Sequence, residues 1–363
     1  MAQYRVGIDI GGTFTDLFLS APGQDTPALH KTLTTPDDPS RGALTGLTEL
    51  LAREGLDMAE LGEIVHGTTL VTNAVIERVG AKVGLLTTTG FRDTLEIGNE
   101  QRYDIYDLDL AFPEPLVSRD LRREVDGRLD GLGREVTPLD EAGLRTELDL
   151  LVAEGCTAIA ICFIHAYRNP AHELRAAEIV KAAYPDLAVS VSSAVVGEIS
   201  EYPRFVTTCA NAFVQPLMAE YLARLERELA GRGFAGSLRL MTSAGGLVPV
   251  DTARALPIRL LESGPAGGAL ATAWFGRAAG LSDVLSFDMG GTTAKACLIE
   301  GGAPHIAPVL EAGREHRFKN GSGLPVRAPT VDMIEIGAGG GSIASIDGVG
   351  LLKVGPRSAG AAP

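Results

Sequence analysis

The chain has 363 residues, enough for about two domains, and its 45% hydrophobic and 21% charged residues are typical of a globular protein. A net charge of −14 argues against nucleic acid or an anionic membrane surface as the partner. The four cysteines form no Cys-x-x-Cys pair, which argues against a disulfide framework or structural zinc and favours small buried residues. No basic segment followed by an apolar run opens the sequence, so we expect a cytoplasmic protein.

The first third of the chain alternates apolar strands with helical patterns. Tyr4–Ile10 and residues 17–20 flank a glycine turn and predict a hairpin. Pro39–Glu54 has helical periodicity that stops at Gly55. The elements predicted next are a strand ending at 64–66, a helix over 68–78, a strand over 82–87 and an irregular, charged excursion over 91–133.

The alternation resumes beyond residue 133 and predicts a parallel or mixed sheet covered by helices. We expect Pro216 to bend or break a long helix, because proline lacks the N–H that an interior helical position requires. Residues 357–363 suggest no packed element, so we expect the chain to be a fragment. Its C-terminal half would then form an incomplete second lobe that exposes apolar surface. In chain order, the predicted elements are a helix over 138–154, a strand over 158–164, a helix over 170–183, a strand over 188–192, the long helix over 203–229, a strand over 238–241, a helix over 264–279 and a strand over 284–288.

One pattern, apolar–Asp–apolar–Gly–Gly–Thr, occurs twice, within residues 7–16 and 286–295. Each copy ends an apolar strand and precedes another strand, so the repeat predicts a duplicated fold rather than two unrelated tight turns. The equivalent pairs are Asp9 with Asp288, Gly11 with Gly290, Gly12 with Gly291, Thr13 with Thr292, and Asp16 with Lys295.

The residue types of this pattern suit phosphate. Glycines allow close backbone approach, and consecutive N–H groups in such a turn bind anions. Asp9 and Asp288 supply the oxygen ligands that Mg²⁺ prefers. Lys295 would neutralise a transferring phosphoryl group, or it is a solvated hairpin charge. Two such turns facing each other would hold the β- and γ-phosphates of ATP.

Five motifs lie at residues 7–16, 66–74, 263–268, 287–292 and 337–342. Together they resemble the hydantoinase/5-oxoprolinase family, A-type (ATP-binding) subunit, of the actin–hexokinase–Hsp70 superfamily. The resemblance implies an α/β fold of duplicated ribonuclease-H-like lobes, with ATP and Mg²⁺ (or Mn²⁺) between them. We expect a first lobe over 1–200, with an insertion near 91–133, and a second lobe over 201–363. Residues 293–295 depart from the family pattern and leave the subfamily open.

The resemblance also implies which residues form the site. We expect Asp9 and Asp288 to hold the metal and to act in catalysis. Lys295 lies outside the family pattern, and its charge alone makes it a catalytic candidate. The expected nucleotide contacts are Gly11, Gly12, Thr13, Thr15, Gly290, Gly291, Thr292, Gly264, Gly267, Gly268, Gly339 and Gly340.

Two further segments contain candidate residues. His66, at a strand end, is a candidate general base or a structural hydrogen-bonding group. Thr68 and Thr69 would cap the following helix or, with Asn73, meet the substrate. Arg102 lies in the polar segment 99–104 and would hold a substrate carboxylate, or is solvated.

Two enzyme functions fit these motifs. The first is ATP-dependent ring opening of a small cyclic amide (a hydantoin, 5-oxoproline or another lactam), in a hetero-oligomer with a B-type subunit or domain. The second is the nucleotide-binding subunit of an ATP-dependent ketone carboxylase. A sugar kinase is disfavoured, because the sequence has no recognisable motif for the aspartate base of a sugar site. An actin- or Hsp70-like conformational ATPase would not explain the polar segment around Arg102.

Overall fold

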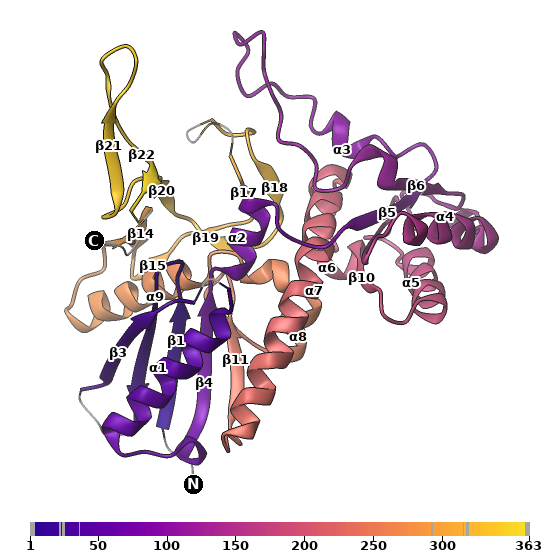
Figure 1. Cartoon of the computed structure of the whole chain (residues 1–363). Coiled ribbons are helices and arrows are strands. Elements are labelled where there is room, and N and C mark those ends of the chain that lie inside the picture. The colour runs from indigo at the N-terminus through magenta and orange to yellow at the C-terminus, as the bar shows by residue number, and fades with distance from the viewer. Residues whose placement is uncertain are drawn as a thin grey trace.

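The computed structural model describes residues 4–21, 23, 26–35, 37–291, 293–314, 316 and 319–359. It is a mixed α/β structure built on three main sheets (Figure 1). The predicted turn residue Thr292 and the last four residues, 360–363, lie outside the described part.

The first sheet contains the predicted N-terminal hairpin. Its strand order is β12–β11–β4–β1–β2–β3, in which β4 runs parallel to both β1 and β11 while β2, β3 and β12 are antiparallel to their neighbours. Helix α1 packs against β2 and β3, begins with a proline in its first turn and ends at Gly55, whose left-handed φ of 68° suits glycine. The bounds are β1 Tyr4–Ile10, β2 Phe14–Ser20, β3 Ala28–Leu33, β4 Leu61–Thr68, β11 Ser237–Met241, β12 Leu247–Pro249, α1 Pro39–Glu54 and the 3₁₀ helix η1 Met58–Glu60.

A second, all-parallel sheet is inserted between β4 and β11. Its strand order is β10–β9–β5–β6, and its central strands β5 and β9 are fully buried. Helix α4 begins at Glu141 and not near Pro138, because the Asp140 carboxylate accepts hydrogen bonds from the N–H groups of Ala142 and Gly143. The bounds are α2 Leu70–Glu77, β5 Val83–Thr88, α3 Thr94–Ile97, η2 Arg119–Leu121, β6 Arg122–Val125, β7 Arg128–Leu129, β8 Glu135–Thr137, α4 Glu141–Ala153, β9 Ala158–Cys162, α5 Ala171–Ala183, β10 Ala188–Val191 and α6 Ser192–Val195.

Helix α7, Glu201–Gly231, runs between these two sheets and contacts both β9 and α1 (Figure 1). It continues through Pro216, so the break that we expected there does not occur. The residues from 203 to 214 are all buried, and this packing favours a continuous helix despite the missing N–H.

The third sheet is built on a second hairpin, β13–β14, to which β15 and β20 add. Helix α9 packs against β13 and β14, and the β21–β22 hairpin projects away from the rest of the chain (Figure 1). The bounds are α8 Val250–Ala255, η3 Pro257–Leu260, α9 Ser263–Ala278, β13 Val284–Met289, β14 Ala294–Glu300, β15 Ala303–Pro304, β16 Ile306–Ala307, β17 Leu310–Ala312, β18 Leu324–Val326, β19 Thr330–Val331, β20 Ile334–Ile336, β21 Ser342–Ile346 and β22 Leu352–Ser358.

The expected division into residues 1–200 and 201–363 does not follow the sheets. Strands β11 and β12, at 237–249, belong to the first sheet, because β11 pairs with β4. The insertion is also larger than residues 91–133, since the second sheet draws its strands from 83 to 191. Local patterns located β11 but missed β12 and β6, and they could not show which sheet each strand joins.

The two hairpins differ in what covers them. In the first, the apolar residues Val6, Ile8, Ile10 and Leu19 are at most 4% exposed, in the core that includes residues of α1. Their equivalents in the second hairpin, Leu285, Phe287, Met289 and Leu298, are 55–59% exposed. Ile334 and Ile336 of β20 continue this surface, which we call the bare face. Exposed apolar surface on the sheet of the second lobe was expected from the sequence, and the third sheet carries it.

All four cysteines are buried and unpaired, as predicted. Among the described residues, no helix combines the length and hydropathy that a membrane crossing requires.

Candidate functional site

The two glycine turns have the same local geometry. In the first hairpin Asp9 pairs with Asp16, and the Gly11 N–H donates to the Phe14 carbonyl at 3.0 Å. In the second, Asp288 pairs with Lys295, and the Gly290 N–H donates to the Thr293 carbonyl at 2.9 Å. The repeat in sequence is therefore a repeat in backbone structure.

The first turn is braced from β3 by Thr34. Its hydroxyl donates to the Gly11 carbonyl at 2.9 Å, and its N–H donates to the Thr13 carbonyl at 3.0 Å. Thr15, predicted to contact the nucleotide, is fully buried, and its hydroxyl lies 3.1 Å from the Thr34 hydroxyl. Thr15 therefore supports the turn from behind, whereas Gly12 and Thr13 stay accessible.

Asp9 lies where two glycines from distant parts of the chain meet. A side-chain Cβ would stand 3.0 Å from Asp9 Oδ1 if placed on Gly67, and 2.7 Å if placed on Gly264. A side chain on Gly264 would displace the carboxylate, and one on Gly67 would press against it. Gly67 is the last but one residue of β4 and Gly264 the second of α9, so Asp9 lies at the junction of both elements.

The two predicted metal-binding carboxylates interact. Partial desolvation by the surrounding protein raises the pKa of Asp9 to about 6, and the negative charges of Asp16 and Asp288 add to the shift. Lys31 opposes it and forms an ion pair with Asp16 at 2.7 Å. Asp9 nevertheless remains accessible to water. The structure thus brings Asp9 and Asp288 close enough for their charges to interact.

A divalent cation fits this pair. Mg²⁺ is usually held by one or two carboxylates together with water and substrate phosphates. Asp9 and Asp288 supply that number, and the mutual repulsion that raises the pKa of Asp9 would be relieved by a cation. Among the residues described, no cluster of three or more metal-ligating side chains occurs.

Helix α9 is tied to the first sheet at its beginning. The Ser263 hydroxyl donates to the Thr68 carbonyl at 3.0 Å and accepts from the Thr68 N–H at 3.1 Å. Of the three glycines predicted here, Gly264 contacts Asp9, whereas Gly267 lies near Met241 and Gly268 is exposed with open space around it.

The third glycine cluster contacts the second turn. Gly340 and Gly341 donate their N–H groups to the carbonyls of Gly290 and Gly291, each at 2.9 Å, and the Gly339 N–H donates to Ser342 Oγ at 2.8 Å. The N–H groups of Gly339 and Gly340 are therefore used within the protein. This cluster braces the second turn, as Thr34 braces the first.

Lys295 is largely buried beside the second turn. Its ammonium forms an ion pair with Glu262, the residue before α9, and lies 3.9 Å from the more exposed Glu335. The prediction of a solvated hairpin charge is wrong for Lys295, whose side chain is 14% exposed. Glu262 was not predicted, because no periodicity or repeat marks it.

His66 is not available as a general base. It is buried, its Nδ1 lies 3.2 Å from the Ile8 carbonyl, and its Nε2 lies 2.7 Å from the Tyr221 hydroxyl. Burial lowers the pKa of His66 to about 4, so the ring is neutral at physiological pH. We correct its role to that of a structural link between β4 and α7.

The threonines after His66 also serve the backbone. Thr68 is buried and its hydroxyl accepts from the Leu70 N–H at 3.1 Å, while the Thr69 hydroxyl donates to the Ile10 carbonyl at 3.2 Å. These bonds connect the start of α2 to the first hairpin. Asn73 is exposed on α2.

Arg102 lies on a long loop between α3 and β6, and this loop projects from the molecule (Figure 1). Its guanidinium donates to the Asp107 carbonyl in the same loop. The loop is anchored to the second half of the chain by the Asp104–Lys319 ion pair and by ring contact between Tyr103 and His316. The hydrogen bond of Arg102 thus lies within the loop and does not reach the hairpins.

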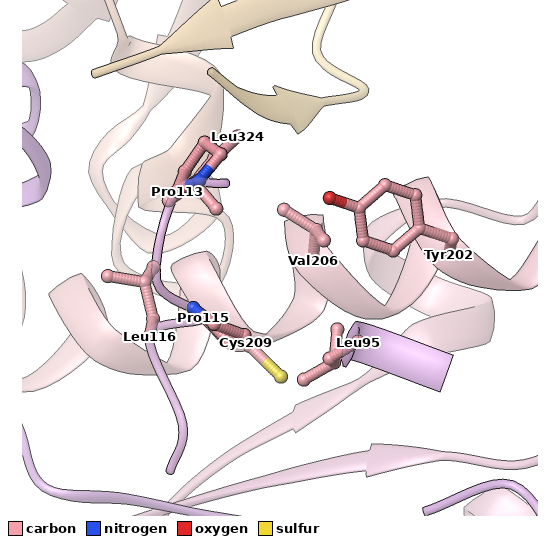
Figure 2. A pocket seen from close by; sticks show the side chains of 8 residues that line it. All are labelled: Leu95, Pro113, Pro115, Leu116, Tyr202, Val206, Cys209 and Leu324. Carbon is pink, nitrogen blue, oxygen red and sulfur yellow. The ribbon is translucent and has the colours of Figure 1, made fainter. Parts of the chain in front are cut away.

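An apolar pocket lies at the base of this loop (Figure 2). Its free space is about that of a single water molecule, too small for a cyclic amide. It contains none of the predicted site residues. The lining residues are Leu95, Pro113, Pro115, Leu116, Tyr202, Val206, Cys209 and Leu324.

Two family models match most of the chain. A model of the hydantoinase/oxoprolinase N-terminal region matches residues 5–184, and a hydantoinase/oxoprolinase model matches residues 204–363. The chain belongs to the hydantoinase/oxoprolinase family. The family resemblance predicted from the five motifs is therefore confirmed.

Relatives within this family include subunits of two enzymes. The chain is 38% identical over 367 residues to the caprolactamase subunit alpha of Pseudomonas jessenii, and 33% identical over 377 residues to the acetophenone carboxylase gamma subunit of Aromatoleum aromaticum. Each match covers 99% of this chain but only 51% and 50% of the relative. The chain thus spans about half the length of these relatives.

Two solved structures share the fold. A nucleotide-free acetone carboxylase structure matches with a TM-score of 0.84 and 28% identity, over 99% of this chain and 52% of that one. The ATP-dependent caprolactamase of Pseudomonas jessenii matches with a TM-score of 0.83 and 36% identity, over 98% of this chain and 51% of that one.

Proposed function

We propose that the chain is the ATP-binding component of an enzyme that opens a cyclic amide, with ATP held between the two glycine hairpins as in duplicated actin-like lobes. The observation that carries this proposal is the pair of matching turns whose aspartates, Asp9 and Asp288, interact. Turn N–H groups would bind phosphate oxygens, and the two carboxylates would hold Mg²⁺ (or Mn²⁺). The metal would neutralise charge on the β- and γ-phosphates.

The chemistry requires activation because an unstrained amide is stabilised by resonance. We propose that the amide oxygen attacks the γ-phosphorus while the bond to the ADP oxygen breaks. Water then adds to the activated carbon, the ring C–N bond breaks as nitrogen gains a proton, and a second water releases inorganic phosphate. The protein's part is positioning and charge neutralisation, for which Lys295 is placed beside the second turn.

An ATP-dependent ketone carboxylase subunit is the second candidate, supported by the similarity to acetone carboxylase. Higher sequence identity to caprolactamase (38% and 36%) than to the two carboxylases (33% and 28%) favours ring opening. Both candidates require polypeptide in addition to this chain. The two relatives are named as enzyme subunits, and each is about twice as long as this chain. We propose a B-type subunit or domain as that partner, in a hetero-oligomer.

Substrate selection is assigned to the loop around Arg102, because the glycine turns are chemically generic. Arg102 is exposed on a loop whose base is anchored to the second half of the chain. Arg102→Ala should raise the KM of a carboxylate-bearing substrate by about tenfold or more while ATP affinity stays unchanged. Steady-state kinetics with the assembled enzyme checks this; loss of ATP affinity instead would place the loop at the nucleotide.

The proposal is tested by nucleotide binding and by turnover. Asp9→Ala and Asp288→Ala should each weaken Mg²⁺-dependent ATP binding and lower ATP turnover at least about a hundredfold, with the fold retained. ATP consumption by the complete enzyme against lactams, hydantoins and ketones with bicarbonate then separates the two candidates. Wild-type turnover in either aspartate variant would refute the assigned site.

A further inference from the structure

Glu262 occupies a backbone conformation that favours glycine. Its φ is 58° and its ψ is 26°, in the left-handed region, which side-chain-bearing residues rarely adopt. Such outliers persist when the surroundings impose them, and they concentrate at functional sites. A glutamate at this position indicates that its side chain is used.

The backbone of Glu262 is fixed relative to the first sheet. Its N–H donates to Thr72 Oγ1 of α2 at 3.1 Å, and its carbonyl accepts from the Ala266 N–H at 3.1 Å. The next residue, Ser263, makes two hydrogen bonds with the backbone of Thr68. The carboxylate therefore extends from a point that cannot shift without moving α2 and α9.

That carboxylate binds the ammonium of Lys295, which belongs to the second hairpin. Glu262 and Lys295 are 10% and 14% exposed, so solvent screens the pair weakly. Lys295 stands opposite Asp288 in the hairpin, at the position that Asp16 occupies in the first. An ammonium has three donors, and Glu335 at 3.9 Å is beyond hydrogen-bond range. Among the residues that the structure describes, two donors thus remain for another anion.

We propose that Glu262 is the positioning residue that holds Lys295 toward the γ-phosphate of ATP. This inference rests on the proposed function. Without the glutamate charge, the flexible lysine side chain turns toward other carboxylates or water and no longer meets the terminal phosphate. ADP, which lacks that phosphate, is unaffected, so the role appears as a preference for ATP over ADP.

The test measures ATP and ADP affinities of the whole chain with Mg²⁺ by titration calorimetry. Glu262→Gln should weaken ATP binding by about tenfold while ADP binding changes less than about twofold. Lys295→Met should give the same loss, and the double variant should lose no more than either single one. Glu335→Gln is the matched control, and it should retain wild-type affinities for both nucleotides.

The outcomes distinguish a failure of this inference from a failure of the proposed function on which it rests. If wild type binds no ATP, or binds ATP and ADP equally, the proposed function or the γ-phosphate contact fails, and the role of Glu262 fails with it. If Lys295→Met selectively weakens ATP binding but Glu262→Gln does not, only the positioning role is overturned. Equal loss of ATP and ADP binding with a lower melting temperature in Glu262→Gln assigns it a structural role alone.

Discussion

The carboxyl group of Asp9 makes stability depend on pH. Its pKa is about 6 in the folded chain, against an ordinary value of 3.8 for an aspartate carboxyl. Between these values the folded state keeps a proton that the unfolded state has lost, so stability falls as pH rises through this window. Asp9→Asn removes this penalty. Without divalent cations, it should melt roughly 1–3 °C above wild type at pH 7.

Calorimetric scans at several pH values check this expectation, and the difference should vanish below about pH 4, where both states are protonated. Added Mg²⁺ should narrow the gap at pH 7 by stabilising wild type. Identical melting temperatures at pH 7 would show that folding does not raise the pKa of the Asp9 carboxyl.

Gly264 is required by the Asp9 carboxylate. In Gly264→Ala the new Cβ would lie 2.7 Å from Asp9 Oδ1, so the carboxylate must move away from the turn. ATP affinity should fall by about tenfold or more, since small displacements of a site group have large effects. A fluorescent ATP analogue measures the loss.

Gly231→Ala, at the end of α7 with open space around it, is the control. It should bind ATP normally and gain up to about 1 kcal/mol of stability, because alanine favours helix over glycine. Equal affinities in the two variants would count against the Asp9 position described here.

At the residue scale, the sequence predicted groups that a repeat makes visible, and the structure brings Asp9, Asp288 and Gly264 together. It did not distinguish a hydroxyl facing the ligand from one bracing the backbone, as Thr15 shows. Glu262 escaped notice because its importance comes from an ion pair between segments far apart in the chain.

At the scale of elements, the link from β4 to α7 through His66 and Tyr221 is a buried hydrogen bond. Tyr221→Phe removes the hydroxyl and leaves His66 Nε2 buried without a partner, at a cost of about 1–3 kcal/mol. Urea unfolding measures this cost, and ATP affinity should not change. The matched control is Tyr184→Phe, whose hydroxyl bonds the exposed Asp149; it should cost about 0.5 kcal/mol or less. Undiminished stability in Tyr221→Phe would contradict the structural role of His66.

Elements with strong local signals were predicted closely. Pro39–Glu54 has both of its bounds as expected, because proline and glycine mark its ends. The short strands from β15 to β20 were missed, since two or three residues carry no readable period.

At the scale of the whole molecule, the inserted sheet shows which strand pairings cannot be predicted from a single sequence. Period and turn chemistry identify β11, but its pairing with β4 depends on contacts across more than 170 residues. The mixed α/β class was predictable, whereas the membership of each sheet was not.

The bare face should make the isolated chain sensitive to salt. A net charge of −14 keeps copies apart at low ionic strength, but the screening length falls from ~10 Å at 0.1 M salt to ~3 Å at 1 M. Light scattering should then show self-association at 1 M salt, reduced in Leu285→Ser/Phe287→Ser. Leu150→Ser, on a helix outside the bare face, should behave as wild type; equal behaviour of all three proteins would exclude this face as the contact.

The two turns are completed at different times during synthesis on the ribosome, because their bracing residues follow them at different distances along the chain. Thr34 follows the first turn by some twenty residues, so that turn can close early. The second turn is braced by Gly340 and Gly341, and the Ser358 hydroxyl donates to the Gly291 carbonyl at 3.1 Å. At roughly 5–20 residues per second, the second turn waits several seconds longer for its partners. A nascent chain should therefore hold one finished turn while the other is still open.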